Sequence, residues 1–288
     1  GKKVGFAISR RQVVLEIQER MAQAFPTIQV IAVCEGYTEI VDGDLIICTM
    51  HQLYRYAQAF DLLIMDEIDA FPYRGNTLLE VIAESACKGR RLYLTATPDE
   101  ALLAQVKQGS LAMVELFQRP HAHPLVVPQI VHTLPLFQLL YLWHFLIQKK
   151  KEGTQVLVFV PTISLAKSCH NLLKLKFQSA VLTSKSEDKE RIIAAFHERR
   201  YDLLVCTTVL ERGITIKGVD VIVLYSDHEV FSEASLIQII GRVGRSIEQP
   251  SGKGVLLCTR ITSDIQRCVR AIKAMNETLS SDMIVKGN

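Results

Sequence analysis

The chain has 288 residues and carries 33 Lys and Arg against 30 Asp and Glu, for a formal net charge of +3. Hydrophobic residues make up 49% and charged residues 22%, which is typical of a globular protein and excludes an extended disordered chain. The charge is too small to indicate nucleic-acid binding by itself, so any such surface must be a local patch.

The cysteine pattern argues against a zinc site, because none of the seven cysteines forms a C-x-x-C pair and most have apolar neighbours. We expect reduced core thiols in a cytosolic protein. No apolar run is long enough to span a bilayer, and the N-terminus lacks the pattern of a secretory signal. It instead leads directly into a predicted strand, as in a fragment of a longer chain.

Short apolar runs alternate with amphipathic stretches in the first hundred residues. This alternation predicts a parallel sheet with crossover helices. The predicted strands are Val4–Ile8, Gln29–Val33, Leu45–Cys48, Leu62–Met65 and Arg91–Thr95, and the clearest helices are Val13–Phe25 and Leu78–Cys87.

Residues 119–135 contain four prolines, at positions 120, 124, 128 and 135. Proline at this density cannot continue a helix or a central strand, so we predict an extended inter-domain linker. The alternative is a metal site formed by His121, His123 and His132. Their spacing fits no zinc pattern, and the linker is favoured.

The alternation resumes after the linker. A capping box, Ser184-x-x-Glu187, is expected to open a helix through Arg199, and Gln238–Ile240 is expected to begin a helix or to lead into one. The other predicted helices are Leu136–Lys151, Ser164–Phe177 and Ile265–Leu279, and the strands are Gln155–Val160, Ser179–Leu182, Asp202–Cys206, Asp220–Leu224 and Gly254–Thr259.

Adjacent carboxylates, Asp66 and Glu67, follow the apolar run Leu62–Met65. Ligands of an open parallel sheet bind beyond the carboxyl ends of its strands, so these acids can reach a metal ion and a phosphate chain. Asp66 would hold Mg²⁺, usually through water, and Glu67 would orient or deprotonate the attacking water. Two solvated acids in a turn are the alternative, and the pair alone is a weak signal.

The segment Gln238–Arg245 places Arg242 and Arg245 three residues apart, and we expect them on one face of a helix. Gly241 directly precedes Arg242, and Gly244 lies between the two arginines. Glycine lowers the stability of a helix, so a function should require these two glycines. Presenting two guanidinium groups to phosphate oxygens is such a function, whereas a merely basic exposed helix does not explain both glycines.

Two further segments follow predicted strands. Thr95 and Thr97 could couple a nucleotide site to domain movement, but a turn capped by Thr97 or Asp99 is favoured for that segment alone. Thr207, Thr208 and Gly213 could contact a phosphate. Each segment taken singly is an ordinary connection between a strand and a helix.

Taken in order, these segments resemble the motifs of superfamily 2 helicases and translocases. Within that superfamily the resemblance is strongest to the ComFA family of late competence proteins. It rests on the stretches 66–73, 119–125 and 208–213, and helicases similar to PriA or RecG remain the alternative. The motif-like segments are Ile8–Val14 (Ia), Cys48–Gln52 (Ib or Ic), Asp66–Asp69 (II), Thr95–Thr97 (III), Val158–Thr162 (IV), Thr207–Gly213 (V) and Gln238–Arg245 (VI).

The resemblance implies an α/β fold of two RecA-like parallel-sheet domains in tandem, over residues 1–118 and 136–288, joined by the linker 119–135. ATP and Mg²⁺ would bind between the domains, and single-stranded DNA would cross both. Asp66, Glu67, Gln238, Arg242 and Arg245 would be catalytic, with the two arginines as arginine fingers. Thr95, Thr97 and Gly213 would couple hydrolysis to movement. The implied DNA contacts are Arg10, Arg11, Thr49, Gln52, Pro161, Thr162, Thr207 and Thr208.

The activity implied by the resemblance is DNA-stimulated ATP hydrolysis that drives DNA uptake during transformation. It implies a cytoplasmic protein, peripheral at the inner face of the cell membrane beside the uptake channel, with ComFC and DprA as partners. No transmembrane segment is expected.

The sequence departs from the family pattern in two places. It contains no G-x-x-x-x-G-K-[ST] phosphate loop, which the family places before Lys2, and no N-terminal cysteine pairs. We therefore expect a fragment whose first domain lacks the phosphate-loop strand and helix, and which is inactive alone. Thr215 also stands where many relatives have an aspartate near the ribose.

Three functions remain open on the sequence. The first is an ATP-driven translocase on single-stranded DNA. The second is a degenerate motor that binds DNA or a partner without turnover, against which the presence of both acids and both arginines argues. The third, a nuclease or metal hydrolase, needs more convergent carboxylates than Asp66, Glu67 and Asp69.

Overall fold

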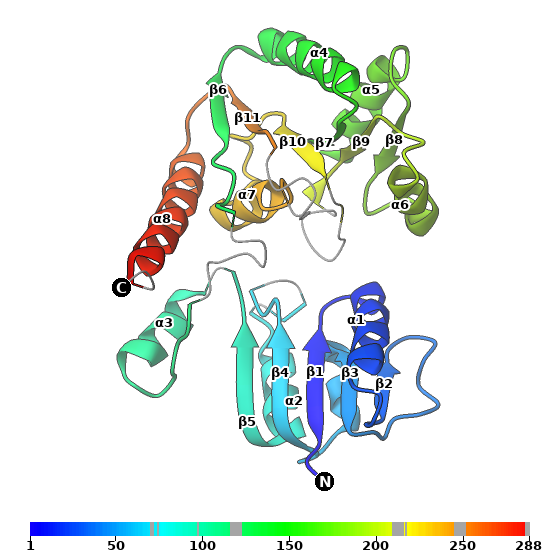
Figure 1. Ribbon diagram of the computed structural model, residues 1–288, viewed down its shortest axis with the longest axis vertical. Helices are drawn as coiled ribbons and strands as arrows, with labels where there is room; N and C mark the ends of the chain where they lie inside the picture. Colours follow the sequence, from blue (N-terminus) through cyan, green and yellow to red (C-terminus); the bar gives the residue numbers. More distant parts are fainter. Residues whose placement is uncertain are drawn as a thin grey trace. The chain divides into compact units, whose positions relative to one another are not determined.

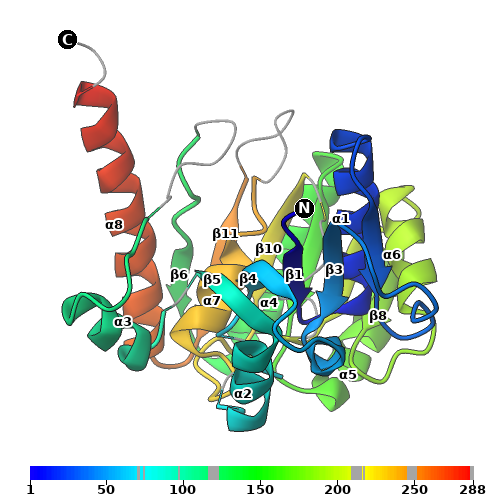
Figure 2. The same ribbon diagram turned by 90° about the horizontal axis from the view of Figure 1, so that it is seen from below.

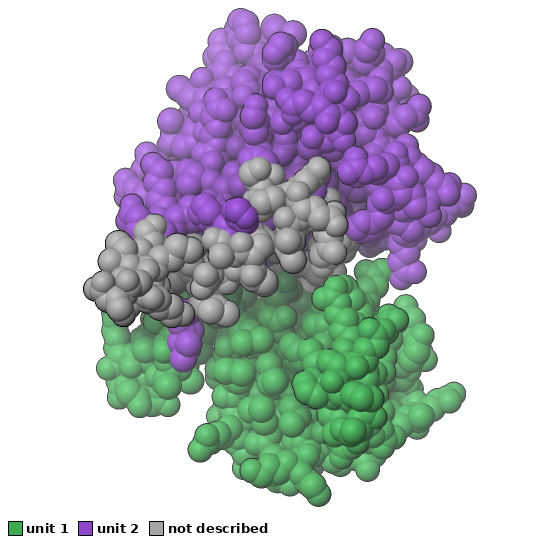
Figure 3. Space-filling view, in the orientation of Figure 1, with its two compact units in different colours: residues 1–113 green, residues 114–288 purple. Residues whose placement is uncertain are grey.

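The computed structural model divides into two compact units, residues 1–113 and 114–288 (Figure 3). It describes residues 1–69, 72–73, 75–96, 98–115, 123–208, 216, 218–244 and 252–285, and of 278–285 it describes the backbone alone. Each unit is built around one parallel sheet with helices on both faces (Figure 1).

Unit 1 contains a five-stranded sheet in the order β2-β3-β1-β4-β5, in which every pairing is parallel. Its strands are β1 (Val4–Ile8), β2 (Val30–Val33), β3 (Leu45–Thr49), β4 (Phe60–Asp66) and β5 (Cys87–Leu94). Its helices are α1 (Arg11–Ala24), α2 (Thr77–Ala86), α3 (Glu100–Lys107) and the 3₁₀ helix η1 (Met50–Arg55).

The alternation of side chains along these strands builds two core layers in unit 1. Ile8 and Ile47 pack with Val14 of α1 on one face. On the other face, Phe60 and Met65 belong to the layer that includes residues of η1 and α2. Side chains of β1 and β3 are buried or half-buried on both sides, which explains why these strands appear in the sequence as short, continuous apolar runs, whereas most residues of the edge strand β5 are exposed.

Unit 2 contains a six-stranded parallel sheet in the order β6-β11-β10-β7-β9-β8. Its strands are β6 (Gln129–His132), β7 (Gln155–Phe159), β8 (Ser179–Leu182), β9 (Leu203–Cys206), β10 (Val219–Val223) and β11 (Gly254–Cys258). Its helices are α4 (Pro135–Lys151), α5 (Ile163–Leu173), α6 (Lys189–His197), α7 (Glu233–Ile240) and α8 (Ser263–Val285).

The helices of unit 2 also form two layers. Residues of α4 and α5 pack with one set of strand side chains, among them Val158 and Val205. Residues of α6, α7 and α8 pack with the other set, among them Phe159 and Leu256. Figures 1 and 2 show α8 along the side of the unit that carries β6. The described helices include none with both the length and the apolar character needed to cross a bilayer.

Three sequence predictions differ from the structure. The expected linker 119–135 contains β6, which begins directly after Pro128 and pairs with β11 at the edge of the sheet, where proline is tolerated. The expected capping box does not open a helix at Ser184, because α6 begins at Lys189 with Asp188 at its N-cap. The Ser186 hydroxyl accepts a hydrogen bond from the Thr183 amide instead, in a turn.

The third difference concerns Gln238–Ile240, which is the last part of α7 and not the start of a helix. The helix begins after Ser232, whose hydroxyl accepts a hydrogen bond from the Ser235 amide. It ends at Gly241 as C-cap, and Gly244 has φ +68°, a conformation that glycine adopts at little cost. The two glycines that the sequence places in a helix therefore belong to its end.

Candidate functional site

The carboxyl ends of the strands of unit 1 lie at one edge of its sheet, because all five strands are parallel. Residues predicted to be functional lie at four of these ends. They are Arg10 after β1, Thr49 at the end of β3, Asp66 and Glu67 at the end of β4, and Thr95 after β5. The fold thus gathers at one edge residues that are up to 85 positions apart in the chain.

The acid pair has a defined local geometry. Asp66 is the last residue of β4, and its Oδ1 accepts a hydrogen bond from the Glu67 amide at 2.9 Å. Glu67 has φ +54°, a left-handed conformation that is uncommon for residues other than glycine and that clusters at functional sites. The Ser9 hydroxyl donates to Glu67 Oε2 at 3.3 Å. The Glu67 side chain is therefore turned toward the end of β1.

The donor set at this edge fits a hard divalent cation. Magnesium in nucleotide-binding proteins is held by one or two carboxylates together with substrate phosphates. The Asp66 carboxylate and the neighbouring Glu67 supply such oxygens at a strand end, where a phosphate chain can approach.

Two of the predicted DNA contacts of unit 1 also hold local structure. Arg11 donates through Nε to the Glu35 carbonyl at 2.9 Å, and its guanidinium lies 5.8 Å from the centroid of the Tyr37 ring. Arg11 thereby anchors the loop that follows β2. The side-chain oxygen of Gln52 accepts a hydrogen bond from Arg55 within η1.

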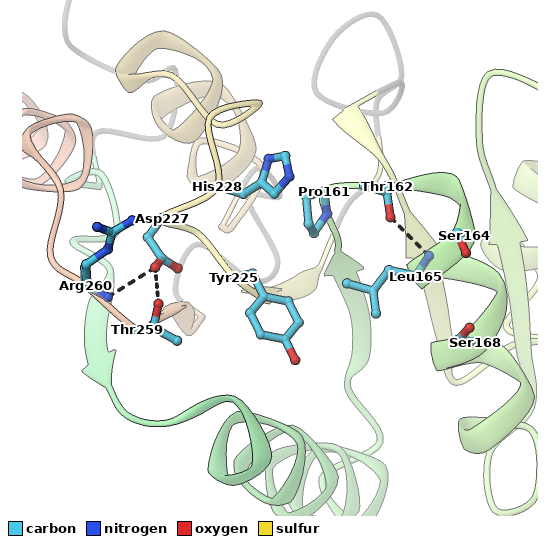
Figure 4. Close-up of a pocket in the computed structure, with 10 residues that line it drawn as sticks. All are labelled: Pro161, Thr162, Ser164, Leu165, Ser168, Tyr225, Asp227, His228, Thr259 and Arg260. Atoms are coloured by element: carbon cyan, nitrogen blue, oxygen red, sulfur yellow. Dashed lines mark hydrogen bonds between the residues drawn. The ribbon is translucent and has the colours of Figure 1, made fainter.

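Unit 2 has a cavity of about 550 Å³ at the carboxyl ends of β7, β10 and β11 (Figure 4). Two of its lining residues, Pro161 and Thr162, are predicted DNA contacts. Thr162 is the N-cap of α5, and its hydroxyl accepts a hydrogen bond from the Leu165 amide at 3.2 Å. The lining residues are Pro161, Thr162, Ser164, Leu165, Ser168, Tyr225, Asp227, His228, Thr259 and Arg260. The other two predicted contacts, Thr207 and Thr208, follow β9 and do not line this cavity.

The other eight lining residues were not predicted to be functional from the sequence: Ser164, Leu165 and Ser168 lie on α5, and five lie on the loops after β10 and β11. Tyr225, Asp227 and His228 follow β10, and Thr259 and Arg260 follow β11. The Asp227 carboxylate joins the two loops, since its Oδ2 accepts hydrogen bonds from the Thr259 hydroxyl and from the Arg260 amide. The sequence offered one signal for these loop residues, which is the presence of polar residues at the ends of consecutive predicted strands. Parallel strands bring such positions together at one edge of the sheet.

Tyr225 is held in an unusual backbone conformation at the floor of the cavity. Its φ is +52°, and its amide donates to the side-chain oxygen of Gln138 at 3.2 Å. Gln138 is fully buried and also donates to the Thr133 carbonyl. Burial raises the pKa of the Tyr225 phenol, which is therefore neutral near pH 7.

The expected helical position of Arg242 is wrong, because α7 ends at Ile240. Arg242 is only 1% exposed. Burial raises the pKa of the Cys206 thiol at the end of β9, and the positive charge of Arg242 opposes that rise. Gln238 lies on α7 and is half-buried. The predicted residues Thr97, Gly213 and Arg245, and position 215, lie outside the described residues.

Comparison with known proteins gives the family. The helicase conserved C-terminal domain matches residues 137–247. The chain is 33% identical over 290 residues to competence protein ComFA of Streptococcus pneumoniae, covering 96% of this chain and 67% of that protein. It is 31% identical to ComFA of Bacillus subtilis, covering 96% of this chain and 62% of that protein. A RecG helicase of Streptococcus pneumoniae is 32% identical over 226 residues, which is 72% of this chain and 32% of that protein.

Solved structures confirm the fold class. Saccharomyces cerevisiae Dbp5 bound to RNA and ADP BeF3 gives a TM-score of 0.69 at 17% identity, covering 96% of this chain and 75% of that one. RecG bound to a three-way DNA junction gives a TM-score of 0.64 at 21% identity, covering 98% of this chain and 40% of the RecG chain. At these identities the likeness concerns the fold, and both units are RecA-like parallel-sheet domains. With the curated relatives, it follows that the chain belongs to the ComFA family of superfamily 2 helicases.

Proposed function

We propose that the gene product containing this chain is an ATP-driven translocase on single-stranded DNA that acts in DNA uptake during transformation. The chain spans 67% and 62% of the two ComFA relatives, so the proposal concerns the whole gene product. The family membership supports helicase chemistry, and the competence role comes from the names of those relatives.

The observation that carries the proposal is the acid pair at the end of β4. Asp66 and Glu67 lie at the edge where a parallel sheet binds its ligands, and Glu67 accepts a hydrogen bond from Ser9. Ser9 directly precedes Arg10, a proposed DNA contact and the N-cap residue of α1. A DNA strand bound at Arg10 would therefore lie next to Ser9, which donates a hydrogen bond to the catalytic acid Glu67.

In the proposed mechanism, ATP supplies the phosphoryl group and Mg²⁺ neutralises its charge when both are bound. Asp66 would hold the metal through water. Glu67 would orient the attacking water and accept its proton at a carboxylate oxygen. Arg242 and Arg245 would stabilise the charge that develops on the transferred phosphoryl group, which requires the guanidinium of Arg242 to become accessible to it.

The remaining finer assignments are proposals of the same kind. Thr95, Thr97 and Gly213 would couple the nucleotide to movement of the units. Single-stranded DNA would contact Thr49, Pro161, Thr162, Thr207 and Thr208, with Arg11 and Gln52 beside the path. The protein would act in the cytoplasm at the inner face of the membrane, with ComFC, DprA and the uptake channel as partners.

The test is the ATPase activity of the gene product, with and without single-stranded DNA. We expect DNA to stimulate hydrolysis and Glu67→Gln to lower the stimulated rate at least about a hundredfold, the scale of a lost general base. Glu39→Gln is the matched control, because Glu39 is exposed in the loop between β2 and β3. A gene product that binds DNA in a salt-sensitive way but never hydrolyses ATP would instead be a non-catalytic binding module.

A RecG-like repair helicase is the second candidate, favoured by the 32% identity to RecG. RecG has been solved bound to a three-way DNA junction. Stimulation of the ATPase by a three-way junction well above that by an equal length of single strand would favour this candidate, whereas the competence role predicts the reverse.

A further inference from the structure

The cavity of unit 2 extends well beyond the two residues that the proposed function uses. Pro161 and Thr162 occupy one side, and the loops after β10 and β11 form the rest. Figure 4 shows His228 close to Pro161, the Tyr225 ring directed away from both, and Asp227 and Arg260 on the side away from Thr162. At about 550 Å³ the cavity lies within the range of small-ligand sites.

The rings that line the cavity suit a flat, aromatic ligand. The lining includes the aromatic rings of His228, which is exposed, and of Tyr225, which is half-buried against the core of α4 and α5, together with the apolar ring of Pro161. Stacking on such side chains is the main way in which proteins hold unpaired bases without reading their sequence. The left-handed backbone of Tyr225 and its hydrogen bond to the buried Gln138 fix the position of that ring before any ligand arrives.

The polar groups of the cavity match the other parts of a nucleotide. Arg260 is exposed at the wall, and a guanidinium binds phosphate oxygens well. Asp227 uses Oδ2 to hold Thr259 and Arg260, whereas Oδ1 is buried and receives no hydrogen bond from any described residue.

We propose that this cavity is a subsite for one unstacked base of a single-stranded nucleic acid, with the base held beside Tyr225 and His228 and a backbone phosphate at Arg260. The inference rests on the proposed function, in which Pro161 and Thr162 contact the backbone of a DNA strand. The cavity would bind one base of that same strand. One guanidinium is too few for a triphosphate, so a strand is favoured over a free nucleotide.

The experiment compares two labelled oligomers of equal charge by fluorescence anisotropy with the 288-residue chain. One is an oligothymidylate of about twelve nucleotides, and the other is an abasic oligomer of the same length. We expect the oligothymidylate to bind about fivefold to a hundredfold more tightly, as base stacking predicts. Tyr225→Leu should bring this ratio close to one, and His228→Ala, at an exposed residue, should lower it.

Arg260→Ala separates the phosphate contact from the base contact. It should weaken both oligomers equally and lower the salt dependence by about 0.7 in the slope of log K against log salt, the value for one phosphate of a single strand. Lys174→Ala is the control, because Lys174 is an exposed cation at the opposite end of α5. Circular dichroism and a thermal melt show whether each variant is folded.

The outcomes separate this inference from the proposed function. Equal affinities of the parent chain for the two oligomers overturn the base subsite but leave a phosphate-binding DNA path intact. A ratio that stays unchanged in His228→Ala and in folded Tyr225→Leu also overturns it, since the bases would then be held elsewhere. If neither oligomer binds to this chain or to the gene product that contains it, the DNA-binding function itself fails.

Discussion

Lys149 and Asp220 form a buried ion pair in unit 2, and removing its positive partner should destabilise the unit strongly. Lys149 is 4% exposed in the last turn of α4, and Asp220 is 3% exposed on β10, with 2.7 Å between Nζ and Oδ2. Replacing one partner of a buried pair typically costs about 3–5 kcal/mol, because the other charge stays buried alone. Asp220 keeps a hydrogen bond from the Lys253 amide, so we expect about 3 kcal/mol for Lys149→Met.

Lys150 provides a control on the same helix. Its Nζ also lies 2.7 Å from a carboxylate, that of Asp202, but the two side chains are 43% and 28% exposed. Exposed pairs contribute about 0–1 kcal/mol, so Lys150→Met should change stability little. The two lysines share residue type, helix and ion-pair distance and differ in burial, although Lys149 also pairs with the more exposed Glu152.

The assay is urea unfolding followed by the fluorescence of Trp143, the one tryptophan of the sequence, which lies on α4 and packs edge-on against Phe177. This probe reports unit 2 even if the two units unfold separately. In thermal unfolding the expected loss for Lys149→Met corresponds to about 6–12 °C for a unit of this size. Equal losses for Lys149→Met and Lys150→Met would refute the argument from burial.

The same pair gives a dependence on pH. Burial alone would lower the pKa of Lys149, but the hydrogen bonds to Asp220 and Glu152 raise it above its ordinary value of 10.5. A raised pKa means that the contribution is complete below pH 10.5 and is lost as the pH rises through the pKa of the folded state. Unit 2 should therefore lose stability at strongly alkaline pH, and Lys149→Met should lose less over that interval.

Two further predictions concern other parts of the fold. Gly89→Ala should destabilise unit 1 by at least about 1–3 kcal/mol, since a Cβ there would lie 1.9 Å from the Asp61 carbonyl oxygen in the neighbouring strand β4. Urea unfolding followed by circular dichroism measures this loss, and an unchanged unfolding midpoint would contradict the close contact between the strands. Burial lowers the pKa of His170 from its ordinary 6.5, so its contribution is complete above pH 6.5 and is lost as the pH falls toward the pKa of the folded state. The melting temperature should therefore fall on acidification below 6.5 less steeply in His170→Gln than in the parent chain.

Much of the fold could be predicted from the sequence, because buried parallel strands are short apolar runs with polar ends. The bounds of β1 and β8 match the prediction, and α4 begins one residue earlier than expected, at Pro135. The failures occur where several local signals compete. Ser184, Ser186 and Asp188 are all possible N-caps; Asp188 precedes α6 without a capping hydrogen bond from its side chain, and Ser186 accepts a hydrogen bond in a turn. Packing of the helix against the sheet decides between such alternatives, and this packing cannot be predicted from any single residue.

The two candidate sites differ in how far the sequence could reveal them. Asp66 and Glu67 are adjacent in the chain, so a motif describes them before any fold is known. The cavity of unit 2 is assembled from the ends of β7, β10 and β11, which are neighbours in the sheet although β8 and β9 separate β7 from β10 in the chain. Asp227 and Thr259 are 32 residues apart and hydrogen-bonded, and this contact exists only because β10 and β11 are neighbours. A motif search finds residues that the chain keeps together, whereas a subsite made by sheet order becomes visible only when the topology is known.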